Sequence, residues 1–545
     1  MRRRTKFGIF LGCVVIVLGI LASIPATMPS RLVPILGLEL GPETTIVTEP
    51  LNEFGFPDYL PVVNQIVGEG VKPEENFWAG FDEILDVEEG GQRYADELRK
   101  WPGFERTSTV PFVSSSRAFR KTPELLEELD RAGRVLWKPA DAPLLVEWLT
   151  QNDEALGIVV DASARSKAYA PLVSVDPDRM LMGTLLPYAQ QCRDVIRAIT
   201  ARSTLRMSAG HYDDAWQDVI ATLRIARHNS RGFCFIERLV GSAIFEMGSK
   251  AATVALTNEP GSADVIRDRW KPAAEAIDSW PSMDHVSRGE RCNLVQMHLM
   301  LLAGFDTDWG GGVDVGKKST AFNVLWMRSK RRIDQLMIAT FSDCNDALRY
   351  TNEFWDELDA ALKQPTYSQQ ADAWRQIESD YLSDVRGATA QGQPAKTKLK
   401  TIAVTMLAPA AGKYIVAEAG TSQRRLLLHA AFVAEIHFRK TGREVESGEQ
   451  LQQLAKQYAP EAGLACPELV DLFTGEPLRL TKVDGVLTIY AVGENGQDDT
   501  ASSDGGDDVD IVLVREDELQ PPPPPLAIEP TSDDDFDALL KGLDF

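Results

Sequence analysis

The chain has 545 residues, of which 44% are hydrophobic, and its formal net charge is −23. The length predicts about two to four domains, and the hydrophobic content is sufficient for a globular core. Residues 498–545 contain 15 acidic residues against Arg515 and Lys541, so more than half of the net charge lies at this end. Such a charge repels nucleic acid and anionic lipid, and it suits cations or basic partners. We therefore expect no nucleic-acid partner.

The N-terminus predicts a membrane anchor. Four basic residues lie within positions 2–6, and residues 7–24 then run without a charge or a proline. This run approaches the roughly 20 residues that cross a bilayer, and the basic residues place the N-terminus in the cytoplasm. The alternative is a cleaved signal peptide, whose apolar region is usually shorter, about 7–15 residues. We predict a single-pass protein of the cell inner membrane, with its bulk extracytoplasmic.

The remaining chain divides by composition and pattern. We predict a cytoplasmic stretch at 1–6, a transmembrane anchor at 7–27 and an extended juxtamembrane segment at 28–70. An α-helical region at 71–420 follows, then an α+β module at 421–515 and an acidic, proline-rich disordered tail at 516–545. Apolar residues spaced three and four apart predict helices over 124–132, 142–152 and, most strongly, within 185–256. Similar patterns predict helices at 367–386, 400–418 and 421–440.

Residues 201–228 predict an antiparallel helical hairpin, because a turn around Gly210 separates two apolar stripes. The pattern of Ala201, Leu205, Gly210, Tyr212 and Ala215 resembles one tetratricopeptide repeat. A solenoid usually needs at least three repeats, roughly 100 residues of repeating sequence, and a single unit is found. The predicted fold class is therefore mainly α, a helical bundle or an irregular helical array behind the N-terminal transmembrane helix.

The C-terminal module predicts two helices followed by a small sheet. The first helix ends near Gly442, and a second covers 448–458. Alternating segments at 478–481 and 487–489 flank Asp484-Gly485, a dipeptide typical of a type I′ hairpin turn. A third strand is predicted at 511–514, which completes a three-stranded antiparallel sheet.

Residues 422–514 resemble the C-terminal region of type II secretion pseudopilins. The resemblance is carried by this set: Thr441-Gly442-Arg443, Asp471, Phe473, Gly475, Pro477, Leu478, Tyr490, Val492, Gly493, Asn495, Gly496, Asp498, Asp499, Asp507, Asp508, Asp510 and Ile511. The apolar run at 7–24 lacks the acid of a pseudopilin helix, and the chain is far longer. The whole layout resembles uncharacterised bacterial single-pass envelope proteins, to which fragments 73–76, 226–228 and 236–240 are similar.

The pseudopilin resemblance implies a calcium site in the acidic loop before the last strand. Its ligands would come from Asp498, Asp499, Asp504, Asp507 and Asp508. Calcium takes 6–8 oxygen ligands, which crowded carboxylates can supply. A solvated acidic loop without a metal is the alternative. The five cysteines outside the membrane run are far apart in sequence, which excludes a disulfide scaffold or a zinc pattern and leaves free thiols or one or two bridges.

The tail predicts a docking peptide. Five prolines at 521–525 form a stiff spacer. Beyond them Phe536, Leu539, Leu540 and Leu543 have the spacing of one apolar helix face, which predicts a short helix over 533–544 that binds a protein partner. A disordered solubilising tail is the alternative.

The sequence contains no recognisable catalytic constellation and indicates no cofactor besides calcium. The functional prediction is a membrane-anchored extracytoplasmic scaffold or interaction protein, related to secretion or envelope assembly. The alternative is a hydrolase-type envelope enzyme whose site assembles from distant residues of the helical region. Converging acidic and histidine side chains with shifted pKa values in a deep pocket would favour that alternative. Nothing in the sequence fixes the oligomeric state.

Overall fold

The structure is a computed structural model, and it describes residues 37–52, 55–85, 91–106, 110–120, 124–174, 180–184, 186–302, 343–389, 395–483, 485–501 and 508–513. The α-helices are α3 (Tyr59–Gly68), α4 (Phe77–Phe81), α5 (Gly91–Leu98), α6 (Ser115–Ala118), α7 (Glu124–Ala132), α8 (Pro143–Gln151), α9 (Asp153–Ser163), α10 (Pro187–Ser208), α11 (Tyr212–Asn229), α12 (Phe235–Asn258), α13 (Ala263–Asp278), α14 (Asp284–Leu302), α16 (Cys344–Leu362), α17 (Tyr367–Thr389), α18 (Ala395–Thr441) and α19 (Gly448–Glu461). Short 3-10 turns cover Pro73–Glu75, Asp82–Ile84 and Leu181–Gly183, and the strands are β1 (Arg479–Val483), β2 (Val486–Ala491) and β3 (Val509–Leu513).

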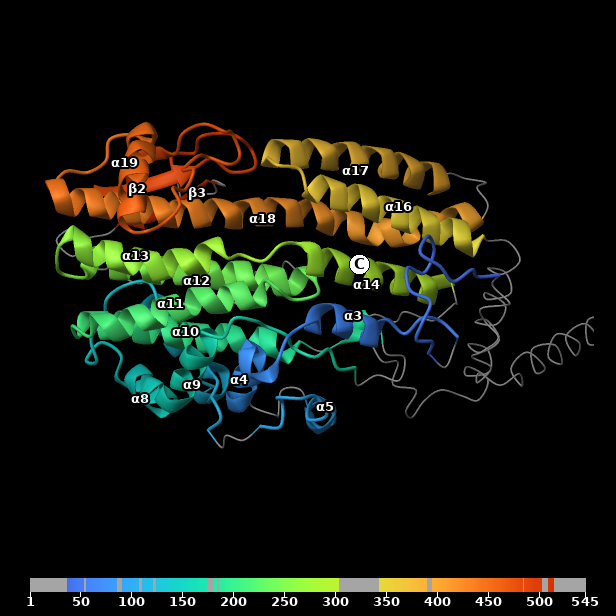
Figure 1. The fold of residues 1–545 in the computed structure, drawn as a ribbon, viewed down its shortest axis with the longest axis horizontal. Helices are drawn as coiled ribbons and strands as arrows, with labels where there is room; N and C mark the ends of the chain where they lie inside the picture. The colour runs from blue at the N-terminus through green and yellow to red at the C-terminus, as the bar shows by residue number, and fades with distance from the viewer. Residues whose placement is uncertain are drawn as a thin grey trace, which may run out of the picture.

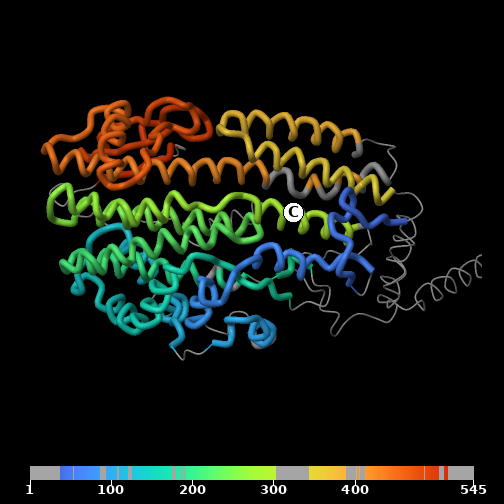
Figure 2. The backbone as a smooth tube through the Cα atoms, viewed as in Figure 1, coloured from blue at the N-terminus to red at the C-terminus, as the bar shows by residue number. Residues whose placement is uncertain are grey.

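The long helices lie side by side in layers (Figure 1). Helix α18 runs along the molecule, with α12, α13 and α14 on one side and α16, α17 and the C-terminal module on the other. Helices α10 and α11 form the next layer, and the short helices α4, α5, α8 and α9 form the far edge. The tube in Figure 2 shows that the chain builds these layers largely in sequence order. The mainly helical fold class with a small C-terminal sheet is confirmed.

Helix α18 is the central helix of the molecule. Its residues 427–436 are apolar on nearly every face, and Leu427, Phe432 and Ile436 are fully buried, which is the pattern of a helix covered on all sides. The prediction of separate helices at 400–418 and 421–440 is wrong, because the helix continues through Gly420. A glycine inside a helix costs only about 1 kcal/mol relative to alanine, which this burial outweighs.

The C-terminal sheet has the order β1-β2-β3, and both pairs are antiparallel. Val483 pairs with Val486, so the β1–β2 hairpin has a two-residue loop, and Gly485 has a φ of +87° as a type I′ turn requires. Ile489 pairs with Ile511, and both are buried in the core that also contains the C-terminal half of α18. The predicted three-stranded antiparallel sheet is therefore confirmed.

Two other predictions have clear outcomes. Helices α7 and α8 lie where the apolar spacing predicted them, and α10 and α11 form the predicted hairpin. The prediction that residues up to 70 are extended is wrong for Tyr59–Gly68, which forms α3. Tyr59, Val63 and Val67 are buried along one face of α3, at a spacing of four that Pro61 in the first turn obscures in the sequence.

Helix α12 is the one helix of the described residues that is long and apolar enough to cross a membrane. In its most apolar window 61% of residues are buried inside the molecule. A core helix meets the same criterion, so this is weak evidence for a membrane span. The predicted anchor at 7–27 lies outside the described residues.

Candidate functional site

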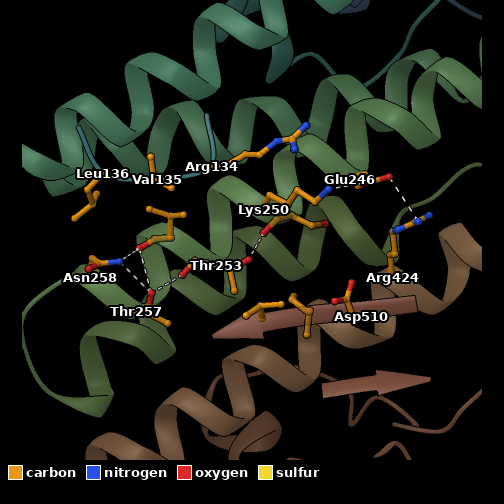
Figure 3. Close-up of a pocket in the computed structure, with 14 residues that line it drawn as sticks. Arg134, Val135, Leu136, Glu246, Lys250, Thr253, Thr257, Asn258, Arg424 and Asp510 are labelled. Carbon is orange, nitrogen blue, oxygen red and sulfur yellow. Dashed lines mark hydrogen bonds and ion pairs between the residues drawn. The ribbon is translucent and has the colours of Figure 1, made fainter. Parts of the chain in front are cut away.

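A groove of about 320 Å³ lies between α12 and the strand β3 (Figure 3). The residues after α7, from Arg134 to Leu136, close one side, and Arg424 of α18 closes the charged end. This volume is at the lower limit of the roughly 300–1,000 Å³ that ligand pockets have. The groove therefore lies where the helical body meets the C-terminal module.

The helical wall of the groove is a row of hydroxyl groups. Ser249, Thr253 and Thr257 lie four residues apart on α12, and each donates its hydroxyl proton to the carbonyl four residues earlier, at 2.9, 2.6 and 2.9 Å respectively. Since the proton is used within the helix, the oxygens of Ser249 and Thr253 keep their lone pairs for an incoming donor. Thr257 Oγ1 keeps one lone pair, because it already accepts from Asn258 Nδ2 at 3.1 Å. The row therefore presents acceptors at a regular interval, on side chains short enough to leave space.

The opposite wall is the edge of the sheet. Within the part of the chain that the structure describes, β3 pairs with β2 alone, so its other edge has no strand partner. Asp510, Ile511 and Val512 all line the groove. Consecutive side chains of a strand point to opposite faces of the sheet. Three consecutive residues of β3 can therefore line the groove because the groove runs along the edge of the strand. An unpaired edge offers backbone donors and acceptors to another chain.

The charges of the groove gather at one end. Lys250 lies 2.6 Å from Glu246, and Arg424 lies 3.6 Å from the other oxygen of this carboxylate. Burial alone would raise the pKa of Glu246, but Arg424, Lys250 and Arg134 lower it, so the carboxylate is ionised. Counting Asp510, the lining holds three cations and two carboxylates. The cation in excess is Arg134, which has no ionic partner among the described residues.

A second, much smaller cavity contains His228 and Glu237. Its volume is about 10 Å³, which is the space of about one water molecule. Burial, with a smaller effect from Arg227, lowers the pKa of His228 to about 3, so its ring is neutral and donates from Nε2 to the Ser163 carbonyl at 3.0 Å. Burial raises the pKa of Glu237 to about 7. The cavity combines shifted pKa values with no room for a substrate.

Residues around this small cavity join several helices of the molecule. The ring of Phe77, which follows fragment 73–76, stacks on His228 with centroids 4.8 Å apart and an interplanar angle of 10°. Glu237 accepts a hydrogen bond of 2.7 Å from the Phe233 amide, and Arg238 binds Glu418 of α18 with its Nε at 3.0 Å. Phe77, His228 and Arg238 therefore join α4, α11, α12 and α18, which is a packing role.

The acids of the predicted calcium site are held by protein donors where they are described. Asp498 accepts from Tyr490 Oη at 3.0 Å and from the Thr500 amide at 2.9 Å, and Arg479 Nε lies 3.3 Å from its other oxygen. Asp508 accepts from the Ala501 amide at 2.9 Å. No group of three or more potential metal ligands occurs among the described residues.

The rest of the predicted site lies elsewhere. The Asp499 carboxylate accepts a hydrogen bond of 3.4 Å from Asn495 Nδ2. Asp504 and Asp507 lie outside the described residues, as do all four predicted docking residues, Phe536, Leu539, Leu540 and Leu543. Calcium binding and tail docking therefore stay predictions. The five described cysteines are free thiols: Cys192, Cys234, Cys292 and Cys344 are buried, and Cys466 is exposed.

The groove was not predictable from the sequence as a whole. One signal was available, since Ser249, Thr253 and Thr257 place three hydroxyls on one face of an otherwise apolar helix. The partner wall was not predictable, because β3 is more than 250 residues further along the chain. No protein-family model, curated protein or solved structure matches this chain.

Proposed function

We propose that this chain is a membrane-anchored extracytoplasmic scaffold for secretion or envelope assembly, and that its groove binds an extended segment of a protein partner. The observation that carries the proposal is the pairing of an unpartnered strand edge with a row of acceptors across a groove. An extended peptide lying beside β3 would satisfy both walls with its own backbone, which is β-augmentation.

The dimensions of the two walls favour an extended ligand. Four residues of α-helix rise about 6 Å, and two residues of extended chain rise about 6.6 Å. Groups that recur every second residue of a peptide can therefore meet Ser249, Thr253 and Thr257 in succession. The backbone groups of a helical ligand would hydrogen-bond to one another, so the edge of β3 would stay unpaired.

The charges favour a ligand with a carboxylate at one end. Glu246 already neutralises much of Lys250 and Arg424, while Arg134 at the same end of the groove forms no ion pair with another described residue. An arginine forms strong charge-assisted hydrogen bonds with a carboxylate. We therefore expect the partner segment to carry Asp, Glu or a free C-terminus where it meets Arg134.

The enzyme alternative receives less support. In the described part of the chain, the site where a histidine and a glutamate with shifted pKa values converge has a volume of about 10 Å³. A hydrolytic site must admit both the scissile group and water, and the groove brings no histidine or cysteine to its lining. Binding is the function that the geometry of the groove favours.

A peptide library displayed against the full chain tests the proposal. We expect the selected peptides to be extended and to carry a conserved acid at one end. Thr257→Trp, which fills the groove, should weaken their binding at least tenfold, or about 1.4 kcal/mol. The matched control is Leu382→Trp, at an exposed position of α17, and it should leave binding unchanged.

Backbone methylation distinguishes strand addition from side-chain binding. N-methyl groups placed at alternate residues of a selected peptide should abolish binding in one register and leave it intact in the other, because only alternate amides of an added strand face β3. Equal binding by the Thr257→Trp chain, or an equal effect of both methylation registers, would contradict the proposal.

A further inference from the structure

Four arginines and a histidine gather where α11 ends and α14 begins. Arg224 and Arg227 are on α11, Arg231 follows its end, and His285 and Arg288 lie one turn apart at the start of α14. Residues three and four apart share a side of a helix, so Arg224 and Arg227 continue toward Arg231. Arg227 Nη1 donates to Ser279 Oγ at 2.9 Å, which joins α11 to the segment that precedes α14.

The electrostatic influence of these groups on one another agrees with that geometry. Burial lowers the pKa of Arg227, and Arg224 and Arg231 lower it further. Burial also lowers the pKa of His285, and Arg231 and Arg288 lower it further. We call this set the arginine cluster: Arg224, Arg227, Arg231, His285 and Arg288.

Two nitrogen atoms in the arginine cluster are enclosed and unsatisfied. Arg231 Nε and His285 Nδ1 are buried atoms that find no hydrogen-bond partner among the described residues. Buried polar atoms are nearly always hydrogen-bonded, and an exception calls for an unseen water or ion. A water in the neighbouring 10 Å³ cavity could reach Arg231, but it would leave the charge uncompensated.

The acids near the arginine cluster do not neutralise it. Neither Arg224 nor Arg288 has an ion pair with any described residue. Asp284 and Glu69 act on His285 from a distance, and both are exposed. Asp284 also accepts from Ser282 Oγ at 2.9 Å. This local excess of positive charge stands out in a chain whose net charge is −23.

We propose that the arginine cluster binds a phosphate group, with Arg231 and His285 donating from within and Arg224, Arg227 and Arg288 supplying charge around it. Guanidinium groups match phosphate oxygens in planar, two-point hydrogen bonds. Favourable placement of cations at a helix C-terminus accounts for Arg227, which is in the last turn of α11. It does not account for two enclosed nitrogen atoms that belong to a loop and to the start of another helix.

The site is separate from the groove beside β3, so it can be tested independently of the proposed function. The full chain, in a neutral detergent, is titrated calorimetrically with inorganic phosphate and with a short-chain phosphatidylglycerol. Saturable binding of either probe is expected. The doubly substituted chain Arg231→Gln, Arg288→Gln should bind at least tenfold more weakly, since two charge-assisted contacts are lost.

A matched control removes one positive charge elsewhere. Arg375→Gln changes an exposed arginine of α17 that forms an ion pair with Asp372 one turn away, and the variant should bind both probes as the unchanged chain does. If the double substitution lowers the melting temperature, the single variant Arg288→Gln replaces it in the titration, because Arg288 is exposed.

Tighter binding of free phosphate indicates a soluble ligand, and tighter binding of phosphatidylglycerol indicates a lipid headgroup. Equal binding by the substituted and control chains, or no binding of either probe, overturns the proposal.

Discussion

Glu237 is a carboxyl group whose surroundings oppose its ionisation. Burial raises its pKa from 4.5 to about 7, although the Phe233 amide donates to it. Between these two pH values the folded chain retains a proton that the unfolded chain has lost. This group therefore contributes its stability in full below pH 4.5 and loses it as the pH rises to about 7.

Glu237→Gln should remove that pH dependence. A glutamine can still accept from the Phe233 amide and never ionises, so the variant should gain stability relative to the unchanged chain above neutral pH, by up to about 3 kcal/mol. Urea unfolding at about pH 5 and about pH 8 measures the difference. Glu494→Gln, at an exposed loop position, is the control. If both variants follow the pH profile of the unchanged chain, Glu237 does not titrate as described.

Asp218 holds the α10–α11 hairpin through a buried ion pair. Its two oxygens accept from Arg202 at 2.7 and 3.1 Å and from Arg206 at 2.8 Å, and it is fully buried. Asp218→Ala would leave the buried Arg202 with only one carboxylate among the described residues, the exposed Asp153 at 2.7 Å. We therefore expect a loss of about 3 kcal/mol, at the lower end of the cost of breaking a buried ion pair. Asp213→Ala, which breaks an exposed pair with Arg269, should cost less than about 1 kcal/mol. Similar losses for the two variants in chemical denaturation would contradict this account.

The partners of individual buried polar side chains could not be predicted from the sequence. The hairpin that contains Arg202 and Asp218 was predicted from its apolar stripes, but the ion pair was not, because a stripe does not show which polar residues face inward. The acidic loop shows the same limit. The pseudopilin resemblance implied a calcium ligand at Asp498, and the sequence did not show that Tyr490 and Arg479 of the sheet lie within reach of this carboxylate.

At the scale of elements, α17 and α18 pack closely enough to require a glycine. A Cβ at Gly412 would lie 2.8 Å from Trp374 Nε1, whereas a Cβ at Gly420 of the same helix would meet nothing nearer than Arg424 at 3.7 Å. Gly412→Ala should therefore destabilise the chain despite the better helix propensity of alanine. Gly420→Ala should stabilise it by roughly 0.5–1 kcal/mol.

Thermal unfolding monitored by circular dichroism measures both changes. The two substitutions are chemically identical and lie eight residues apart on α18, so propensity alone predicts a rise in melting temperature for each. Opposite signs would show that contact with Trp374 decides the outcome at Gly412. A rise for both would mean that α17 moves away at little cost.

Elements were predictable where the pattern was local. The β1–β2 hairpin followed from Asp484-Gly485, and α7 and α8 followed from apolar spacing. Helix α3 was missed because Pro61 obscures its spacing. Helix α18 was predicted as two helices, 400–418 and 421–440, although it is continuous through Gly420. The groove was missed for a different reason: it exists only when α12 and β3 are brought together, and neither segment alone indicates the other.

At the scale of the whole molecule, the layers follow chain order, so most helices pack on sequence neighbours (Figure 2). The exception is α18, which contacts α12, α13, α14, α16 and α17 and also supports the sheet. A partner segment bound between α12 and β3 would therefore contact both the helical body and the C-terminal module. We infer that ligand binding in the groove stabilises the contact between the helical body and the C-terminal module.

The proposed topology can be tested on whole cells. If residues 7–27 anchor the chain with its N-terminus in the cytoplasm, protease added to spheroplasts should digest the bulk of the chain, while a cytoplasmic marker stays intact. The full chain should also remain with membranes after an alkaline wash, because about 20 apolar residues hold a helix in the bilayer. A chain that begins at Met28 should be found in the soluble cytoplasmic fraction and resist the protease. Release of a shortened chain from spheroplasts would instead favour a cleaved signal peptide, and an intact chain in spheroplasts would contradict export altogether.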